Sequence, residues 1–298
     1  MGRGGLSALF HSPAGYGWCG MQRRALLVAG AMVVALVMTS GVAVAAAISC
    51  PNRDGDLCVG TSDADAMTGR DGSDDIRARA GGDSVKALGG KDLLRGGPGE
   101  DRLLGARGSD RLSGGGDIDV LEGGAGEDSL AGGDADDRYN YLREGWGHDT
   151  ISDLPVDDPS PAIDNELFIG GPDSTQPLSI NLVSSDARSE VSSATSTIDW
   201  AGDAINVVRN FSPTGDTIDG NPGPNYIEST GVAGISAGGT DTVSTGGGDD
   251  LVDVDDGAPG DTLNCGGILF PDDDIAFYDA GDTVSNCETR VQDGVVQP

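Results

Sequence analysis

The sequence predicts an all-β protein, a right-handed parallel β-roll or β-helix solenoid. Glycine supplies 50 of the 298 residues, and most of the 49 acidic residues are Asp. Both residue types are unfavourable in helix interiors. Only 4% of the residues are aromatic, which argues against a conventional aromatic-rich core. The composition also fits an acidic disordered chain, and a strict nine-residue repeat decides in favour of the folded alternative.

The repeat runs without a gap from Gly60 to Asn140 as nine blocks of nine residues. Position six is Asp in every block: Asp65, Asp74, Asp83, Asp92, Asp101, Asp110, Asp119, Asp128 and Asp137. Position eight is always apolar: Met67, Ile76, Val85, Leu94, Leu103, Leu112, Leu121, Leu130 and Tyr139. Position one is Gly in seven blocks, and position four is Gly in six: Gly72, Gly81, Gly90, Gly99, Gly108 and Gly126. Chance does not place an unbroken Asp column beside an unbroken apolar column.

Each block is predicted to form a tight turn followed by a short strand. Glycines in the first four positions permit φ > 0 and leave carbonyl groups free to face a ligand. The apolar residue at position eight faces inward, and two blocks form one turn of a solenoid whose strands lie ~4.8 Å apart. The aspartates then divide into two ladders on opposite edges. One ladder contains Asp65, Asp83, Asp101, Asp119 and Asp137, and the other contains Asp74, Asp92, Asp110 and Asp128.

Stacked carboxylates repel one another unless a cation lies between them. Ca²⁺ accepts about six to eight oxygen ligands, whereas Mg²⁺ requires strict octahedral geometry and fits less well. The pattern resembles the RTX nonapeptide family, whose G-G-x-G-x-D-x-U-x repeat forms a calcium-binding parallel β-helix. The resemblance implies that multiple Ca²⁺ ions bind between block n and block n+2, at no more than seven sites for nine blocks (9 − 2). The implied ligands are the nine aspartates and the six position-four glycines.

Some blocks depart from this pattern. Asp63, Asp117 and Ala135 replace the position-four glycine. The first and last blocks are therefore expected to be caps with incomplete sites, and the best consecutive sites are expected between Asp74 and Asp128.

Residues 1–47 are predicted to be a secretory signal peptide. A basic segment without acids ends at Arg24, an apolar run extends from Ala25 to Met38, and small residues lead to cleavage near Ala45 or Ala47. The open alternatives are a start at the second methionine of this segment and an uncleaved membrane anchor. The mature chain is expected to be extracellular, with no stable membrane insertion.

The charge and the cysteines agree with export. Without residues 1–47 the chain has 15 basic residues (18 − 3) and 49 acidic ones, a net charge of −34, which repels nucleic acid and anionic membranes. Four cysteines remain, and an even number in an exported chain favours disulfides. Of the three possible pairings, Cys50 with Cys58 and Cys265 with Cys287 is favoured.

The rest of the mature chain divides into three predicted segments. Residues 48–59 form a Cys-stapled N-terminal cap, residues 141–215 an irregular β-solenoid or linker, and residues 216–298 degenerate repeats with a Cys-closed cap. Parts of the linker resemble segments between RTX arrays in actinobacterial calcium-binding proteins. In the degenerate repeats, Asp241 and Asp249 are the best candidate calcium ligands.

No catalytic motif indicates an enzyme. The chain lacks the H-E-x-x-H motif of zinc proteases. Residues 234–238 match G-x-S-x-G, but no histidine follows Ser236. The sequence therefore predicts a secreted, non-enzymatic protein that binds multiple Ca²⁺ ions and couples its folding to extracellular calcium. A cell-surface adhesin or matrix component and a polysaccharide-modifying β-helix enzyme are the alternatives, and no protein or glycan partner is indicated.

Overall fold

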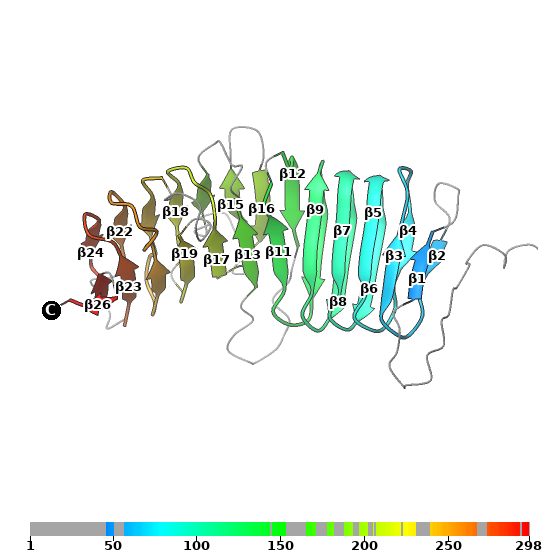
Figure 1. Cartoon of the computed structure of the whole chain (residues 1–298), viewed down its shortest axis with the longest axis horizontal. Helices are drawn as coiled ribbons and strands as arrows, with labels where there is room; N and C mark the ends of the chain where they lie inside the picture. The colour runs from blue at the N-terminus through cyan, green and yellow to red at the C-terminus, as the bar shows by residue number, and fades with distance from the viewer. Residues whose placement is uncertain are drawn as a thin grey trace, which may run out of the picture.

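The computed structural model is an elongated stack of strands, with the N-terminal turns at one end and the C-terminal turns at the other (Figure 1). It describes residues 46–50, 57–143, 145–152, 165–170, 178–181, 188–192, 197–201, 205, 207–221, 223–230, 239–266, 273–292 and 294–297. Within these residues the secondary structure consists of strands without helices, so the predicted all-β class is confirmed. The described part accordingly contains no helix able to cross a membrane.

Two sheets form the solenoid, and successive strands alternate between them over most of the chain. The first sheet contains, in spatial order, β1 (Ala46–Ser49), β3 (Asp65–Thr68), β5 (Ser84–Gly90), β7 (Arg102–Gly108), β9 (Val120–Ala125), β11 (Arg138–Tyr141), β13 (Glu166–Ile169), β17 (Val207–Asn210), β19 (Tyr226–Ser229), β21 (Leu251–Asp253), β23 (Ile275–Tyr278), β25 (Thr289–Gln292) and β26 (Val295–Val296). The second contains β2 (Leu57–Val59), β4 (Asp75–Arg77), β6 (Leu93–Pro98), β8 (Arg111–Gly116), β10 (Ser129–Gly133), β12 (His148–Ile151), β16 (Thr197–Ala201), β15 (Arg188–Ser192), β14 (Ser179–Asn181), β18 (Thr217–Asp219), β20 (Thr242–Ser244), β22 (Thr262–Asn264) and β24 (Thr283–Ser285).

The strand register confirms that two blocks make one turn. Val85 on β5 pairs in parallel with Leu103 on β7, an offset of 18 residues (103 − 85). Beyond Tyr141 the offset varies, but parallel pairing continues from β11 through β13 and β17 to β19. The antiparallel exceptions are β15, which lies between β14 and β16, and β26, which pairs with β25. The parallel β-solenoid is therefore confirmed. The same two sheets pass through all the predicted segments of the mature chain, whose boundaries stay predictions.

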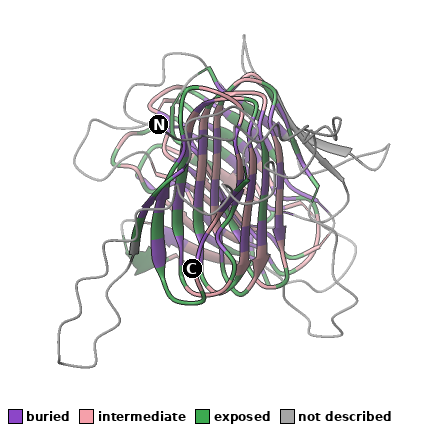
Figure 2. Ribbon diagram, turned by 90° about the vertical axis from the view of Figure 1, so that its right-hand side faces the viewer, coloured by how far each residue is buried: buried purple, intermediate pink, exposed green. Residues whose placement is uncertain are grey.

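The core lies between the sheets as one column of inward-facing side chains from each. All the position-eight residues, from Met67 to Tyr139, are at most 2% exposed, as predicted. The columns continue beyond the repeats with residues such as Leu167 and Ile227 on the first sheet and Ile218 on the second, all 0% exposed. Figure 2 shows buried residues alternating with more exposed ones along the strands, as the two-residue period of a strand requires.

The stacked turns explain the glycine pattern. Position two has a left-handed backbone from the third to the ninth block, at Arg79, Leu88, Gly97, Ala106, Gly115, Gly124 and Gly133. A Cβ atom at Gly97 would overlap the carbonyl oxygen of Arg79 in the preceding turn. The turns therefore pack backbone against backbone. Arg79 itself has a φ of 90°, a conformation that costs about 1–2 kcal/mol for a residue with a side chain.

Replacing Arg79 by glycine is expected to stabilise the protein by about 1 kcal/mol, because glycine adopts this conformation without strain. The measurement is the thermal unfolding midpoint at a fixed calcium concentration. Arg79→Ala is the matched control, since it removes the same side chain but keeps the Cβ atom. An equal gain from both variants would show that side-chain removal, and not backbone relief, is responsible.

Both favoured cysteine pairings are present in the structure. The Cys50–Cys58 disulfide joins the end of β1 to β2, the first strands of the two sheets. The Cys265–Cys287 disulfide joins the residue after β22 to the segment between β24 and β25. The predicted signal peptide, apart from Ala46 and Ala47, lies outside the described residues.

Candidate metal centre

The nine repeat aspartates form the two predicted ladders, but their side chains are buried inside the solenoid. Their exposed fractions range from 0% at Asp119 and Asp137 to 4% at Asp74. Positions six and eight are two residues apart, and such side chains point to the same face of a strand. The Asp side chain therefore faces inward, like the core residue at position eight. The prediction of two edge ladders did not include this burial.

In each ladder aspartate, or rung, from Asp83 to Asp137, one carboxylate oxygen accepts a backbone hydrogen bond from the preceding turn. The N–H of Asp83 donates to Oδ1 of Asp101 over 2.7 Å, and the N–H of Asp101 donates to Oδ1 of Asp119 over 2.8 Å. On the other edge the N–H of Asp92 donates to Oδ1 of Asp110 over 2.8 Å. These bonds hold successive carboxylates in register, one turn apart.

The second carboxylate oxygen of many rungs is buried without a hydrogen-bond partner. This is Oδ2 in Asp83, Asp92, Asp101, Asp110, Asp119 and Asp128. Buried polar atoms are nearly always paired in folded proteins, and a buried ionised carboxylate is costly unless an opposite charge accompanies it. The chemistry of such a row of oxygens fits a cationic ligand.

The unpaired oxygens face the glycine turns. A Cβ atom at Gly105 would lie 2.5 Å from Oδ2 of Asp110 and 2.6 Å from the carbonyl oxygen of Gly123. The absence of a Cβ atom at Gly105 leaves this room, and oxygens from two different turns meet beside it. The position-four carbonyls also stack, because the oxygen of Gly108 faces Gly126.

Side chains alone do not complete a metal site in the ladders. Among the residues that the structure describes, no three His, Cys, Asp or Glu side chains gather at one point. A cation in a ladder would therefore combine one or two Asp carboxylates with carbonyl oxygens of the turns. Such an all-oxygen, flexible ligand set suits Ca²⁺.

Burial raises the pKa of the ladder carboxyl groups, because desolvation disfavours their charged form. The pKa of Asp92 rises to about 6, those of Asp101 and Asp110 to about 7, and that of Asp119 to about 8. The backbone N–H donor opposes this rise, and the neighbouring ladder carboxylates add to it. Without a cation Asp101, Asp110 and Asp119 are therefore partly protonated near neutral pH, and a divalent cation would supply the positive charge instead.

The ladders continue beyond the regular blocks, as expected for the degenerate repeats after residue 216, and they also include Asp149 and Asn165, which the sequence analysis did not identify. Oδ1 of Asp149 accepts the N–H of Asp128, and Oδ1 of Asn165 accepts the N–H of Asp137. In the C-terminal turns one ladder contains Asn225, Asp250, Asp274 and Glu288, and the other contains Asp216, Asp241, Asp261 and Asp282. The separation between rungs varies from 14 to 28 residues, which conceals them from a search for a fixed period. The remaining signal is an Asp or Asn two residues before an inward-facing apolar residue.

The structure separates the two C-terminal candidates, Asp241 and Asp249. Asp241 is a ladder rung, and both of its carboxylate oxygens accept hydrogen bonds. Asp249 is exposed, and its Oδ1 accepts the N–H of Asp273. The ladder position belongs to Asp250, because Val252 faces the core two residues later. The sequence analysis therefore assigned the ladder position of this turn one residue too early, to Asp249 in place of Asp250.

Neutral side chains donate to the second carboxylate oxygen of two C-terminal rungs, Asp216 and Asp241. Nδ2 of Asn210 donates to Oδ2 of Asp216 over 2.7 Å, and the hydroxyl of Ser229 donates to Oδ2 of Asp241 over 2.5 Å. Nδ2 of Asn210 also donates to the hydroxyl oxygen of Ser229 over 3.1 Å. These two rungs are complete without a cation.

Replacing Ser229 by alanine is expected to destabilise the protein by about 1–3 kcal/mol, because it leaves Oδ2 of Asp241 buried without a donor. The loss should be the same with calcium and with a chelator, since this rung already has its donor. Thermal unfolding under both conditions measures it. Ser113→Ala, at an exposed position of β8, is expected to change stability by less than about 0.5 kcal/mol. A loss seen only in calcium would contradict the assignment.

Comparison with known families agrees with this geometry. Residues 54–85, 78–112 and 113–143 match the family model of the RTX calcium-binding nonapeptide repeat (4 copies). No curated protein matches the chain. The matched residues coincide with the turns in which the ladders keep their regular spacing. The chain therefore contains RTX calcium-binding nonapeptide repeats between residues 54 and 143.

Proposed function

We propose that this chain is a secreted, non-enzymatic protein whose Asp and Gly turns bind multiple Ca²⁺ ions and whose folding depends on extracellular calcium. The observation that supports this most is the row of buried Oδ2 atoms without partners in the repeat aspartates. A solenoid that buries ionised carboxylates in its interior requires a compensating cation, and the repeats contain no buried basic side chain.

The proposed ligands are the nine repeat aspartates and carbonyl groups of the glycine turns. The position-four glycines, Gly72, Gly81, Gly90, Gly99, Gly108 and Gly126, belong to this set, and the position-one carbonyls that face the Asp side chains extend it. Asp241 and Asp249 are left out, because the first has donors on both oxygens and the second is exposed. The proposed sites are therefore concentrated in the regular turns.

Export is supported by two features of the sequence and the structure. The N-terminal 47 residues have the order of a secretory signal, with a basic segment, an apolar run and small residues. Both disulfides are of the kind that persists in oxidising compartments. Extracellular calcium would thus be available to the repeats after secretion, and calcium ions are the proposed partners.

Calcium titration of the purified protein tests the proposed sites. Asp101→Asn removes one ladder charge while retaining an oxygen that can accept the N–H of Asp83. We expect this variant to bind fewer ions in native mass spectrometry and to need about tenfold more calcium for half-maximal strand content. Glu100→Gln, at the exposed neighbouring position, is expected to behave as the unchanged protein. Equal ion counts in all three proteins would contradict the assignment.

The metal-free protein is expected to be more stable at pH 5 than at pH 8. Folding raises the pKa of Asp101 and Asp110 to about 7 and that of Asp119 to about 8, whereas an unfolded Asp has a pKa of about 3.9. Protonation therefore favours the folded state, and this contribution is complete below about pH 4 and lost as the pH rises through about 7–8. Unfolding midpoints in chelator across this range measure the effect. Saturating calcium should remove most of the dependence, and a midpoint in chelator that rises with pH would contradict the sign.

A further inference from the structure

Asp261, in the turn between β21 and β22, has an unpaired buried oxygen outside the matched repeats. The residue is 2% exposed, and its Oδ1 accepts the N–H of Asp241 over 2.7 Å. Its Oδ2 is buried and has no hydrogen-bond partner. The rung therefore has the same incomplete carboxylate as the regular repeats, and it differs from Asp241, where Ser229 supplies the donor.

Other carboxylates act electrostatically on Asp261. Desolvation, together with the charges of Asp282, Asp256 and Asp279, raises its pKa to about 6, although the N–H donor of Asp241 opposes this rise. Asp282 accepts backbone N–H bonds on both oxygens, from Gly260 and Asp261 on one and from Asp279 on the other. These bonds hold the 254–261 turn against the 279–282 turn. The structure thus maintains several negative charges around one buried, incomplete carboxylate.

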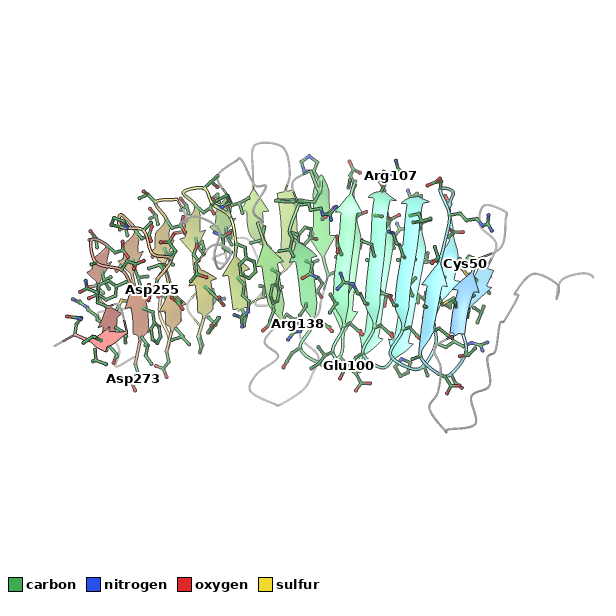
Figure 3. The ribbon with its side chains drawn as sticks, in the orientation of Figure 1. Cys50, Glu100, Arg107, Arg138, Asp255 and Asp273 are labelled. Atoms are coloured by element: carbon green, nitrogen blue, oxygen red, sulfur yellow. A yellow bond between two sulfur atoms is a disulfide. The ribbon has the colours of Figure 1, made fainter. Side chains whose placement is uncertain are left out.

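No basic side chain offsets this charge. Residues 239–298 contain 14 acidic residues and one basic residue, Arg290. The Nε–H of Arg290 donates to the carbonyl oxygen of Cys287. In the N-terminal turns, by contrast, acidic side chains on the outer faces pair with arginines, such as Asp75 with Arg95. Figure 3 shows the side chains of both regions, with Asp255 and Asp273 labelled in the C-terminal turns.

We propose that Asp261 is the primary ligand of a further Ca²⁺ site, formed by the turns at 254–261 and 279–282 and separate from the nonapeptide sites. Either Asp256 or Asp279, whose charges act on Asp261, is the additional carboxylate proposed for this ion, and backbone carbonyl oxygens of the two turns are proposed to complete its shell. The identity of this ion as Ca²⁺ rests on the calcium binding proposed for the repeats. The hydrogen-bonded rungs of Asp216 and Asp241 separate this site from the N-terminal ladders.

Native mass spectrometry of the calcium-loaded protein tests the site by counting ions. Asp261→Asn retains Oδ1 as the acceptor for Asp241 but replaces the unpaired oxygen by an amide nitrogen. This variant is expected to bind one ion fewer than the unchanged protein. Asp255→Asn removes an equal charge at an exposed position in the same turn and is expected to keep the full count. An unchanged count in Asp261→Asn would overturn the site, even where Asp101→Asn lowers the count and so supports the repeat sites.

Hydrogen exchange of the unchanged protein provides a test that does not depend on a variant. The amides of Gly257, Ala258, Gly260 and Asp261 are expected to exchange at least tenfold more slowly in calcium than in chelator. The test is made in Asp101→Asn as well, where the repeat sites are weakened and this protection is expected to persist. Equal exchange at 257–261 with and without calcium would overturn the C-terminal site. Failure of the repeat sites appears separately, as unchanged exchange at 93–116.

Discussion

Removing calcium at pH 8 is expected to unfold the turns between Asp65 and Asp149. At this pH the chelated protein must bury ionised carboxylates without a counter-ion, at a cost of several kcal/mol for each charge. Calcium at a hundredfold its Kd adds about 2.7 kcal/mol for each bound ion. A typical domain is stable by only about 5–15 kcal/mol, so the loss of a few ions is sufficient to unfold these turns.

Far-ultraviolet circular dichroism of residues 48–298 in calcium and in chelator measures the overall loss of strands. Trp146 reports locally, since it is 3% exposed and packs edge-to-face on Tyr141 with ring centroids 5.8 Å apart. A Trp200→Phe variant isolates its fluorescence, because these are the tryptophans of the chain after residue 47. Magnesium at equal ionic strength is the control and is expected to restore little structure. A complete strand signal in chelator at pH 8 would refute calcium-dependent folding.

Gly108→Ala is expected to destabilise the calcium-bound protein by about 3 kcal/mol, the sum of backbone strain and overpacking. Gly108 has a φ of 130°, which L side chains rarely adopt. A Cβ atom there would also overlap the carbonyl oxygen of Gly90 in the preceding turn. Neither backbone can move without separating two turns. The variant is therefore also expected to bind calcium more weakly at the adjacent rungs.

Gly116→Ala is the matched control for this prediction. Gly116 lies in a neighbouring turn, and a Cβ atom there would meet nothing within 4 Å. Its replacement is expected to change stability by less than about 0.5 kcal/mol. Thermal unfolding and calcium titration of both variants give the comparison. Similar losses from Gly108→Ala and Gly116→Ala would show that glycine content, and not the close stacking of turns, limits the fold.

The regular repeat allowed a large part of this fold to be predicted from the sequence. The apolar column from Met67 to Tyr139 and the grouping of the aspartates into two ladders follow from the nine-residue period, because each block makes the same turn and strand. Beyond Tyr141 the prediction became less specific. Asp137 and Asn165 are 28 residues apart, whereas Asn225 and Asp250 are 25 apart, so equivalent rungs no longer have a constant spacing. The displaced register at Asp249 has the same cause.

By itself, the sequence determined the solenoid, the calcium-binding repeats and the pairs of nearby cysteines, because these are properties of local spacing. Only the tertiary structure decided which carboxylates are incomplete. Asp101 and Asp261 each retain a buried oxygen without a partner, whereas Asp241 receives the hydroxyl of Ser229, 12 residues earlier in the chain. The physical reason is that the donors to a buried carboxylate come from neighbouring turns, and their identity depends on how the turns stack.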